Sequence, residues 1–545
     1  MNISRAEWAF PIFLALVVLV ATGLPYLAGW FVSTPDQVFE GFVIDVDDAH
    51  SHLAKMQQGY LGEWEYHILF TPEPHDGVYI NVFYITLGHV ARLLGSNLVI
   101  TYHGARMIFG FIYLLTAYTF IAFFLPDLTR RRLAYVLICF SSGLGWLALL
   151  FGGSFVAGDI TPVDFWLIEM YSYLTVMVFS HTSLALTLML VVFALTLRYL
   201  ETNRWTAIAA ATTGAVAISL IHPYSLLVID LVIAGHWLLS TIRRRQIWLL
   251  PLPGLLVLAL APMPIVAYQY VAISGNPILS AWQAQSFTFS PAPWHYVLGY
   301  GVVLALSIPG GWWALRQNGR WPLLALWPLI VIPLLYAPIV FNLQRRLIEG
   351  VQVPLCILAT VGMTRYVLPA VRHSRLAASL SARGYPSWRS ELLVRNVLVA
   401  LTLPSTLLLI LSASLAAISG VPDDMIYSAG EIAAVDWLGD NSSRDDTVLA
   451  SYAIGGFIPA RIGHRVFMGH WAETVDLPTK RAAADRFYGA AGDDERRAIL
   501  GQYGIVYVLY GPREREMGHF DPAQTDYLTP VFTDCGVSVF QVTWE

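Results

Sequence analysis

An acidic run near the N-terminus, Asp45-Val-Asp47-Asp48-Ala-His50-Ser-His52, has the residue types that proton transfer or metal binding needs. Three carboxylates within four positions repel one another, so such a cluster is solvated, binds a cation, or holds one proton at a raised pKa. If a helix begins near Asp47, this residue can cap it, and Asp48 and His52 then share a face. Three interpretations stay open: a capped interfacial helix, a catalytic site on Asp47 and Asp48, and a divalent-cation (Mg, Mn, Ca or Zn) site on Asp47, Asp48 and His52.

Other polar residues stand beside long apolar segments. A polar turn, Glu73-Pro-His75-Asp76, precedes Val78–Gly95, which has the pattern of an amphipathic helix in the membrane interface. Arg345 and Arg346 lie between two apolar runs, and a planar guanidinium suits a phosphate as well as the nearby Glu349. We predict a substrate-binding set, with a purely structural role open for each member: His50, Glu73, His75, Glu169, His181, His222, Arg345 and Arg346.

The composition indicates a membrane protein. Of 545 residues, 56% are hydrophobic and 13% are charged, whereas soluble domains carry roughly 25% charge. This excludes an ordinary soluble enzyme and a nucleic-acid partner. The three cysteines are too few and too dispersed for a disulfide scaffold.

Apolar runs of sufficient length predict about eleven membrane spans. The expected spans are 9–31, 104–126, 134–152, 181–200, 205–221, 224–242, 248–269, 295–315, 321–341, 350–370 and 396–420. The stretches 78–91 and 163–180 leave the count open by one or two. The loop 32–103 is much longer than the others, and long loops often carry function.

The distribution of arginine predicts the orientation. With the N-terminus in the cytoplasm, 16 of the 22 basic residues before position 421 fall in cytoplasmic segments, as the positive-inside rule expects. An odd number of spans then places the C-terminal part outside the cytoplasm. We predict a multi-pass protein of the plasma (inner) membrane, in contact with its lipids.

The last quarter of the chain has a different character. Residues 421–545 hold 19 acidic and 10 basic residues, whereas residues 1–420 hold 18 and 22. Buried strands are expected at 446–452, 504–510 and 537–542, and helices at 431–438, 478–488 and 493–503. We therefore predict a transmembrane domain over 1–420 and a soluble extracytoplasmic α/β domain over 421–545. Its segment Gly469-His470-Trp471-Ala-Glu473-Thr474 suits contact with a sugar or acceptor, or a packed turn.

The acidic run, the long first loop and the soluble C-terminal part together resemble GT-C glycosyltransferases, multispanning enzymes that use polyprenyl-phosphate-linked sugars. The protein O-mannosyltransferase and aminoarabinose transferase-like enzymes are the members in question. Asp47-Asp48-Ala-His50 resembles the Asp-Glu-x-His motif of protein O-mannosyltransferases, with Asp in place of Glu at the second position. Val78–Gly95 resembles the aromatic-rich helix that follows this loop in many bacterial members. The likeness in architecture covers the whole chain, whereas the motif is short.

This resemblance implies inverting transfer of a sugar from a polyprenyl-phosphate donor to an acceptor on the outer face. Asp47 would be the catalytic carboxylate and Asp48 a helper or cation ligand. Arg345 and Arg346 are phosphate candidates on their position and chemistry alone. The acceptor, whether protein, lipid or glycan, is left open, as is the need for a metal. The alternatives are a lipid or glycan transporter and a non-catalytic scaffold that keeps the fold.

Overall fold

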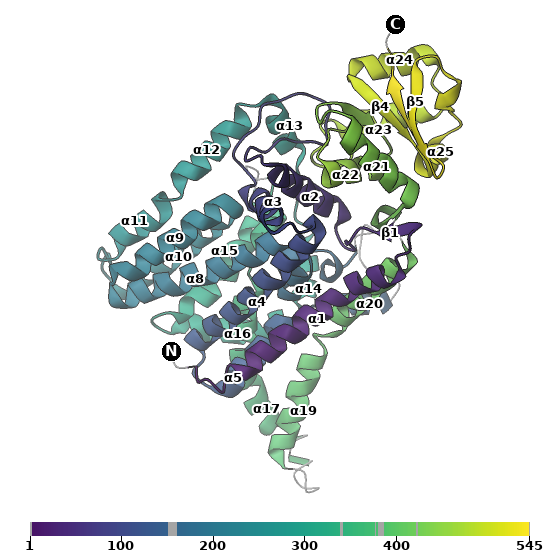
Figure 1. Cartoon of the computed structure of the whole chain (residues 1–545). Coiled ribbons are helices and arrows are strands. Elements are labelled where there is room, and N and C mark those ends of the chain that lie inside the picture. Colours follow the sequence, from purple (N-terminus) through teal and green to yellow (C-terminus); the bar gives the residue numbers. More distant parts are fainter. Residues whose placement is uncertain are drawn as a thin grey trace. The chain divides into compact units, whose positions relative to one another are not determined.

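A computed structural model describes residues 3–150, 161–337, 342–375, 378–379, 386–420 and 423–543 (Figure 1). The chain divides into two compact units. The helical unit comprises Met1–Leu24, Arg106–Val266 and Thr288–Ser412. The mixed unit comprises Pro25–Ala105, Ala267–Phe287 and Ala413–Glu545.

Most of the long apolar segments form helices. Four helices have residues in both units: α1 (Ala9–Val32), α4 (Leu98–Phe124), α12 (Met263–Ser274) and α20 (Pro404–Ser419). The other helices of the helical unit are α5 (Leu128–Phe140), α6 (Gly145–Leu150), α7 (Ser172–Val178), α8 (Ser180–Thr202), α9 (Trp205–Ile221), α10 (Ser225–Arg244), α11 (Leu252–Leu260), α14 (Pro293–Arg316), α15 (Trp321–Leu334), α16 (Gln352–Gly362), α17 (Leu368–Arg372) and α19 (Ser387–Ala400). Short 3-10 turns cover Val163–Phe165, Ile168–Met170 and Gln344–Ile348.

Eight helical segments in the described part of the chain are long and apolar enough to cross a membrane. They are Ala9–Val32, Leu98–Phe124, Ser180–Thr202, Ser225–Arg244, Leu252–Ser274, Pro293–Arg316, Gln352–Arg372 and Trp388–Ser419. Three shorter apolar helices cover Val82–Leu94, Trp205–Ile221 and Trp321–Leu334. The protein is therefore a helical, multi-pass membrane protein, and the count of eleven spans stays a prediction.

One expected span is wrong. The segment 134–152 is not one helix, because α5 ends at Phe140 and α6 begins at Gly145. Between them the Ser142 amide donates to the Thr402 carbonyl at 2.7 Å. At Gly143 an added Cβ would lie 2.1 Å from the Gly299 carbonyl oxygen. The chain leaves the helix here because it runs against the backbone of its neighbours. Residues 151–152 of this expected span lie outside the described residues.

The mixed unit contains a four-stranded sheet in the order β3-β4-β6-β5. Strand β3 (Thr447–Leu449) is parallel to β4 (Ile505–Tyr510), and β6 (Val537–Val542) is antiparallel to both β4 and β5 (Leu528–Asp534). A separate antiparallel pair joins β1 (Gln37–Phe39) to β2 (Ile426–Ser428). The helices of this unit are α2 (Val46–Leu61), α3 (Val82–Leu94), α13 (Pro277–Gln285), α21 (Ala429–Asn441), α22 (Tyr452–Ile462), α23 (Leu477–Tyr488), α24 (Asp493–Gln502) and α25 (Pro512–Met517).

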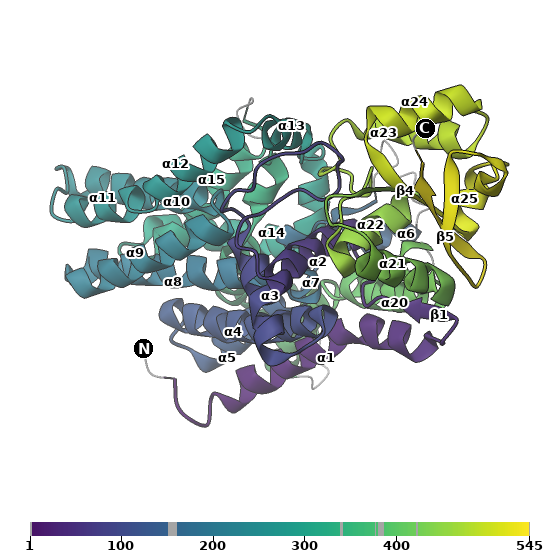
Figure 2. The same cartoon turned by 45° about the horizontal axis from the view of Figure 1, so that its top comes forward.

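Side chains of the sheet alternate between two buried cores, as the period of a strand requires. Tyr507 and Leu509 of β4 pack with α21 and α22, whereas Val508 packs with α23 and α24. Figure 2 labels β4 and these four helices. The expected helices and strands after residue 430 are present, although β3 ends at Leu449 because α22 already begins at Tyr452. Ala54 and Phe70 of the long loop join the α21–α22 core.

Helix α2, which carries the acidic run, is held against α3 by a close backbone contact. A Cβ added at Gly59 of α2 would lie 2.0 Å from the Ile85 carbonyl oxygen. A Cβ added at Gly88 of α3 would lie 1.9 Å from the Met56 carbonyl oxygen. Only glycine permits this approach, so these two residues set the position of α2.

Candidate active site

Asp47 and Asp48 lie in the first turn of α2. The helix begins at Val46, and its preceding residue, Asp45, has φ 57° and makes no side-chain cap bond. Capping of the helix by Asp47 is therefore wrong, since Asp47 is already inside the first turn. This leaves its carboxylate available for tertiary contacts. Acidic groups in a first turn are also favoured by the helix dipole.

Asp48 is held by two N–H donors from the segment after Met468. Oδ1 of Asp48 accepts from His470 Nε2 at 3.1 Å and from Trp471 Nε1 at 3.3 Å. His470 Nδ1 faces the amides of Ala472 and Glu473 at 3.1 and 3.0 Å. Burial lowers the pKa of His470, but the Asp48 bond and nearby carboxylates give a net rise. Because Nδ1 accepts hydrogen bonds from two backbone N–H groups, it carries no proton. We therefore assign His470 as a neutral imidazole whose proton is on Nε2 and is donated to Asp48.

Asp47 makes a different contact. Its Oδ2 accepts from the Tyr452 hydroxyl at 2.8 Å. Burial raises the pKa of Asp47 above its usual range, although the Tyr452 hydrogen bond works in the opposite direction. A carboxylate with a raised pKa is a stronger base than an ordinary aspartate, which favours proton transfer to it. The two neighbouring carboxylates thus differ. Asp47 has a raised pKa and is the candidate base, whereas Asp48 is held by hydrogen bonds from His470 and Trp471.

A buried ion pair supports this arrangement from one turn further along α2. Glu473 Oε1 accepts from Ser51 Oγ at 2.6 Å and from Lys55 Nζ at 2.8 Å, and Lys55 and Glu473 are 5% and 3% exposed. Burial alone would raise the pKa of Glu473, but the Lys55 charge and the hydrogen bonds from Lys55 and Ser51 hold it at about 2. The pair ties the loop that carries His470 to α2.

The loop itself is fixed from two further sides. Thr474 Oγ1 accepts from the amides of Gly469 and His470 at 3.1 and 3.2 Å. Gln285, the last residue of α13, donates to the carbonyls of Ala472 and Thr474 at 2.7 and 2.6 Å. His470 and Trp471 therefore point at Asp48 from a constrained turn.

Two predicted substrate-binding residues have structural partners. Glu73 pairs with Lys480, with Oε1 and Nζ 2.7 Å apart. His75 Nε2 accepts from the Ile68 amide at 2.9 Å, and Nδ1 lies 2.9 Å from the Glu73 carbonyl. Burial lowers the pKa of His75. Both side chains order the loop between α2 and α3, and their role in substrate binding stays a prediction.

The side chains proposed for a cation are not assembled as a metal site. His52 stacks on Tyr84 with ring centroids 4.0 Å apart, while Oδ1 of Asp48 accepts two N–H donors. Among the described residues, no three His, Cys, Asp or Glu side chains are placed to hold a metal ion. A divalent-cation site on Asp47, Asp48 and His52 therefore stays a prediction.

A second polar cluster lies in the helical unit and contains five of the other predicted residues, Glu169, His181, His222, Arg345 and Arg346, whereas His50 lies on α2 in the mixed unit. Arg346 Nε is 3.8 Å from Glu169 Oε1, and His181 and His222 have ring centroids 5.3 Å apart. His222 Nδ1 is 2.7 Å from Glu349 Oε2. Burial raises the pKa of Glu349 and lowers that of His222, so burial favours the neutral form of each group.

Arg345 completes this cluster. Its guanidinium lies over the Trp166 ring at 5.0 Å, and its backbone amide donates to the Thr288 carbonyl at 3.0 Å. Its Nε is buried and has no hydrogen-bond partner among the described residues. A buried N–H without a partner costs free energy unless a ligand or water satisfies it.

The structure adds Tyr452 to the candidate residues. Nothing near Tyr452 in the sequence marks it, because it follows a short strand and begins a buried helix. Lys55 and Lys480 are easier to single out in the sequence, since they are the two lysines among 32 basic residues. Both form buried pairs with a glutamate of the same unit.

Sequence comparisons find no match: no protein-family model and no curated protein matches this chain. Several solved structures, however, are similar to this chain. ArnT from Cupriavidus metallidurans bound to undecaprenyl phosphate has a TM-score of 0.52 at 14% identity, covering 99% of this chain and 98% of that one. The apo Archaeoglobus fulgidus oligosaccharyltransferase gives 0.52 at 13% identity, covering 93% and 70%.

A third match is the arabinofuranosyltransferase AftD from Mycobacteria, with a TM-score of 0.51 at 14% identity. It covers all of this chain and 40% of AftD, which is much longer. The three proteins are glycosyltransferases of the GT-C type. The likeness to all three confirms the resemblance at the level of the fold: this chain has the GT-C fold.

Proposed function

We propose that the protein is a membrane glycosyltransferase that moves a sugar from a polyprenyl-phosphate donor to an acceptor. Two observations support this proposal. The fold is that of GT-C glycosyltransferases, one of which is bound to undecaprenyl phosphate. The mixed unit holds a poised carboxylate, Asp47, beside an anchored one, Asp48. The contact of Asp47 with Tyr452 is the observation that carries the assignment of the catalytic group.

In this proposal Asp47 takes a proton from the acceptor nucleophile. The nucleophile forms a bond to the anomeric carbon, and the bond from that carbon to the phosphate oxygen breaks, so the configuration inverts. The electron pair of the broken bond stays on the polyprenyl phosphate. Asp48 acts as a positioning residue, because its bonds to His470 and Trp471 fix the first turn of α2. No metal enters this scheme.

Arg345 and Arg346 would hold the donor phosphate. A guanidinium can bind phosphate with two parallel N–H donors, and the leaving phosphate gains charge as the bond breaks. The buried Nε of Arg345 supports this role, since a phosphate oxygen would satisfy it. Glu169, His181 and His222 would shape the same pocket. The membrane would be the plasma membrane, with the mixed unit outside the cytoplasm.

The first test replaces the catalytic carboxylate. Cells that lack the protein are complemented with wild type or with Asp47→Asn, and their glycolipids and surface glycans are compared by mass spectrometry. We expect Asp47→Asn to restore none of the lost glycosylation, since removal of a catalytic base costs roughly 100-fold or more in rate. Asp45→Asn is the matched control, because asparagine tolerates the left-handed backbone there.

Full restoration by Asp47→Asn would contradict the catalytic role and favour a non-catalytic scaffold. Unchanged glycans in the cells that lack the protein would leave no transfer reaction to explain and would favour a transporter of other cargo. Expression and membrane insertion of each variant are measured in parallel.

A second test addresses the phosphate. Binding of undecaprenyl phosphate to the purified protein is measured by native mass spectrometry for wild type, Arg345→Gln and Arg316→Gln. We expect Arg345→Gln to weaken binding about tenfold, the value of one charge-assisted hydrogen bond. Arg316→Gln is the control, because Arg316 also lies over a tryptophan, Trp312, at 4.1 Å. Equal affinities for all three proteins would overturn the phosphate assignment.

A further inference from the structure

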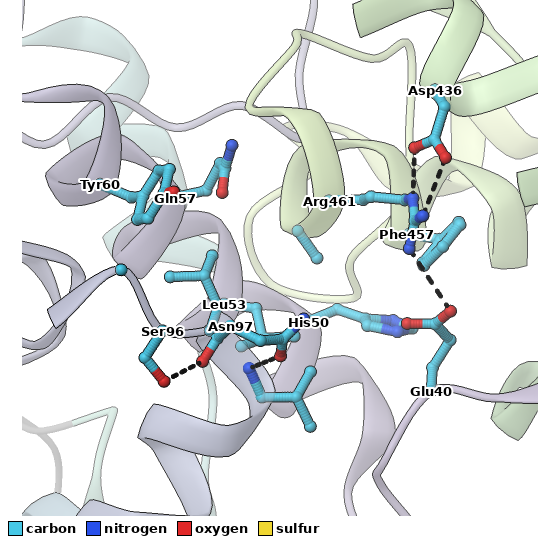
Figure 3. A pocket seen from close by; sticks show the side chains of 14 residues that line it. Glu40, His50, Leu53, Gln57, Tyr60, Ser96, Asn97, Asp436, Phe457 and Arg461 are labelled. Carbon is cyan, nitrogen blue, oxygen red and sulfur yellow. Dashed lines mark hydrogen bonds and ion pairs between the residues drawn. The ribbon is translucent and has the colours of Figure 1, made fainter. Parts of the chain in front are cut away.

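A pocket of about 380 Å³ opens on another side of α2 (Figure 3). All of its lining residues belong to the mixed unit. Helix α2 contributes four of them at helical spacing, His50, Leu53, Gln57 and Tyr60. The rest come from the turn between α3 and α4, from the first two residues of α4, from Glu40, and from α21 and α22. The volume lies at the lower end of the range for small-molecule pockets, about 300–1,000 Å³.

The charged groups of this pocket disfavour an anionic ligand. Arg461 binds Asp436 through two hydrogen bonds of 2.5 and 2.9 Å, and its Nη1 lies 3.7 Å from Glu40 (Figure 3). Two carboxylates thus surround one guanidinium. A phosphate would meet a site whose positive charge is already compensated. The pocket therefore differs in kind from the Arg345–Arg346 cluster.

A buried histidine in the lining has a ring nitrogen that makes no hydrogen bond to the described residues. His50 is 2% exposed, and its Nε2 has no hydrogen-bond partner among the described residues. Burial lowers the pKa of His50 to about 3, so the ring is neutral and carries one donor and one acceptor. Burial also raises the pKa of Glu40 to about 7. His50 and Glu40 can therefore each form hydrogen bonds with ligand hydroxyls, which act as donors or as acceptors.

The outer part of the pocket adds planar and aromatic groups. Tyr60 is 36% exposed, and Gln57 lies one turn before it on the same face of α2. Side-chain amides, carboxylates and guanidinium groups pair with the hydroxyls of a ligand, and an aromatic face packs on its C–H surface. Leu53 and Phe457 supply apolar walls. A hydroxyl-rich ring without charge matches this lining.

We propose that this pocket binds an uncharged sugar unit. Hydroxyls of the ligand would pair with His50, Gln57, Glu40 and Arg461, and its apolar face would contact Tyr60. Helix α2 carries both this pocket and Asp47, and His50 follows Asp47 by about 4.5 Å along the helix axis. The bound unit would be part of a glycan acceptor. That last step rests on the proposed function, whereas binding itself does not.

The test measures binding without turnover. Full-length protein in lipid nanodiscs, prepared free of glycoside detergents, is titrated with the methyl glycosides of glucose, galactose, mannose and N-acetylglucosamine. Saturation-transfer difference NMR reports contact with each. We expect saturable, millimolar binding of at least one glycoside, and about tenfold weaker binding for Gln57→Ala and for Tyr60→Ala.

Two controls make the result specific. Arg444→Gln removes an ion pair of the same unit, that between Arg444 and Glu63 at 2.7 Å, and should leave binding unchanged. The Asp47→Asn variant should also bind the glycoside normally. A result that contradicts sugar binding in the pocket can therefore be distinguished from one that contradicts the catalytic role of Asp47. Absence of saturable binding, binding that is unchanged by Gln57→Ala and Tyr60→Ala, or displacement of the bound glycoside by lower concentrations of inorganic phosphate or glucosamine would overturn the proposal.

Discussion

At the scale of single residues, the acidic run could be recognised from the sequence but its partners could not. Asp47 and Asp48 stand out because three carboxylates crowd four positions. The residue that anchors Asp48, His470, is 422 positions away, and Tyr452 is 405 positions from Asp47. No local pattern encodes a contact of that range. The different surroundings of the two carboxylates, a tyrosine hydroxyl at Asp47 and two N–H donors at Asp48, therefore become visible only in the folded chain.

The Tyr452 hydroxyl should tune the proton affinity of Asp47. Its hydrogen bond lowers the pKa of the carboxylate against the effect of burial, so Tyr452→Phe should raise that pKa further. A base acts when deprotonated, and therefore the rising limb of the pH–rate profile should move to higher pH. Tyr510→Phe, which removes a hydroxyl bonded to the Phe520 carbonyl, is the control. A profile that falls in amplitude without moving would assign Tyr452 a structural role.

The Lys55–Glu473 pair should make the mixed unit sensitive to acid. Because the pKa of Glu473 is held at about 2 in the folded protein, its stabilisation is complete above the unfolded value and is lost as the pH falls toward 2. Glu473→Gln should flatten the decline of the melting temperature below about pH 4.5. Thermal unfolding followed by tryptophan fluorescence measures this.

Removing one partner of the same pair leaves a buried charge alone. Lys55→Met should cost about 3–5 kcal/mol of unfolding free energy, and adding Glu473→Gln should recover part of this loss. A double variant no more stable than Lys55→Met would show that the two residues are not coupled.

At the scale of elements, apolar length and periodicity predicted most helices, but not where they break. The expected span 134–152 is interrupted between α5 and α6, because backbone contacts with Thr402 and the Gly299 region replace helical bonds. Such contacts depend on neighbours distant in the sequence. In the last quarter of the chain, the sequence pattern predicted β3, β4, β6, α21, α23 and α24. It did not predict β5, because four of the seven residues of this strand are exposed and it lacks a continuous apolar run.

The α2–α3 crossing gives a prediction about helix position. Gly88→Ala would place a Cβ 1.9 Å from the Met56 carbonyl oxygen, so the helices must separate, at a cost of about 1–3 kcal/mol. Transfer activity should fall as well, because α2 carries Asp47. Gly104→Ala in α4 is the control, since no heavy atom lies within 4 Å of the added Cβ. The melting temperatures of the two variants are compared; equal values would show that the crossing can relax.

At the scale of the molecule, the long loop 32–103 was expected to be functional, but its place in the architecture was not foreseen. It folds with the C-terminal residues into one compact unit, through β1–β2 pairing, the two lysine–glutamate pairs and a shared core. Composition separates apolar from polar segments. It does not reveal which polar segments share a core. The boundary at residue 420 and the placement of residues 421–545 outside the cytoplasm stay predictions.

Orientation can be tested with a native cysteine. Cys535 is exposed, whereas Cys139 and Cys356 are buried. A membrane-impermeant maleimide added to intact cells should label the protein at Cys535, and Cys535→Ser should remove this labelling. Labelling that appears only after the cells are opened would place the mixed unit in the cytoplasm and reverse the proposed topology.

The two lysine–glutamate pairs have a practical consequence. Lys55 and Lys480 are 5% and 2% exposed, so the native protein withholds both of its lysine amines from solvent. An amine-reactive reagent can reach them when the loop between α2 and α3 parts from the α22–α23 segment. The rate of lysine acylation therefore reports the local opening of this unit, and ligands that bind the closed form should slow it. The chain thus carries an intrinsic chemical probe of the state in which its acidic residues are assembled.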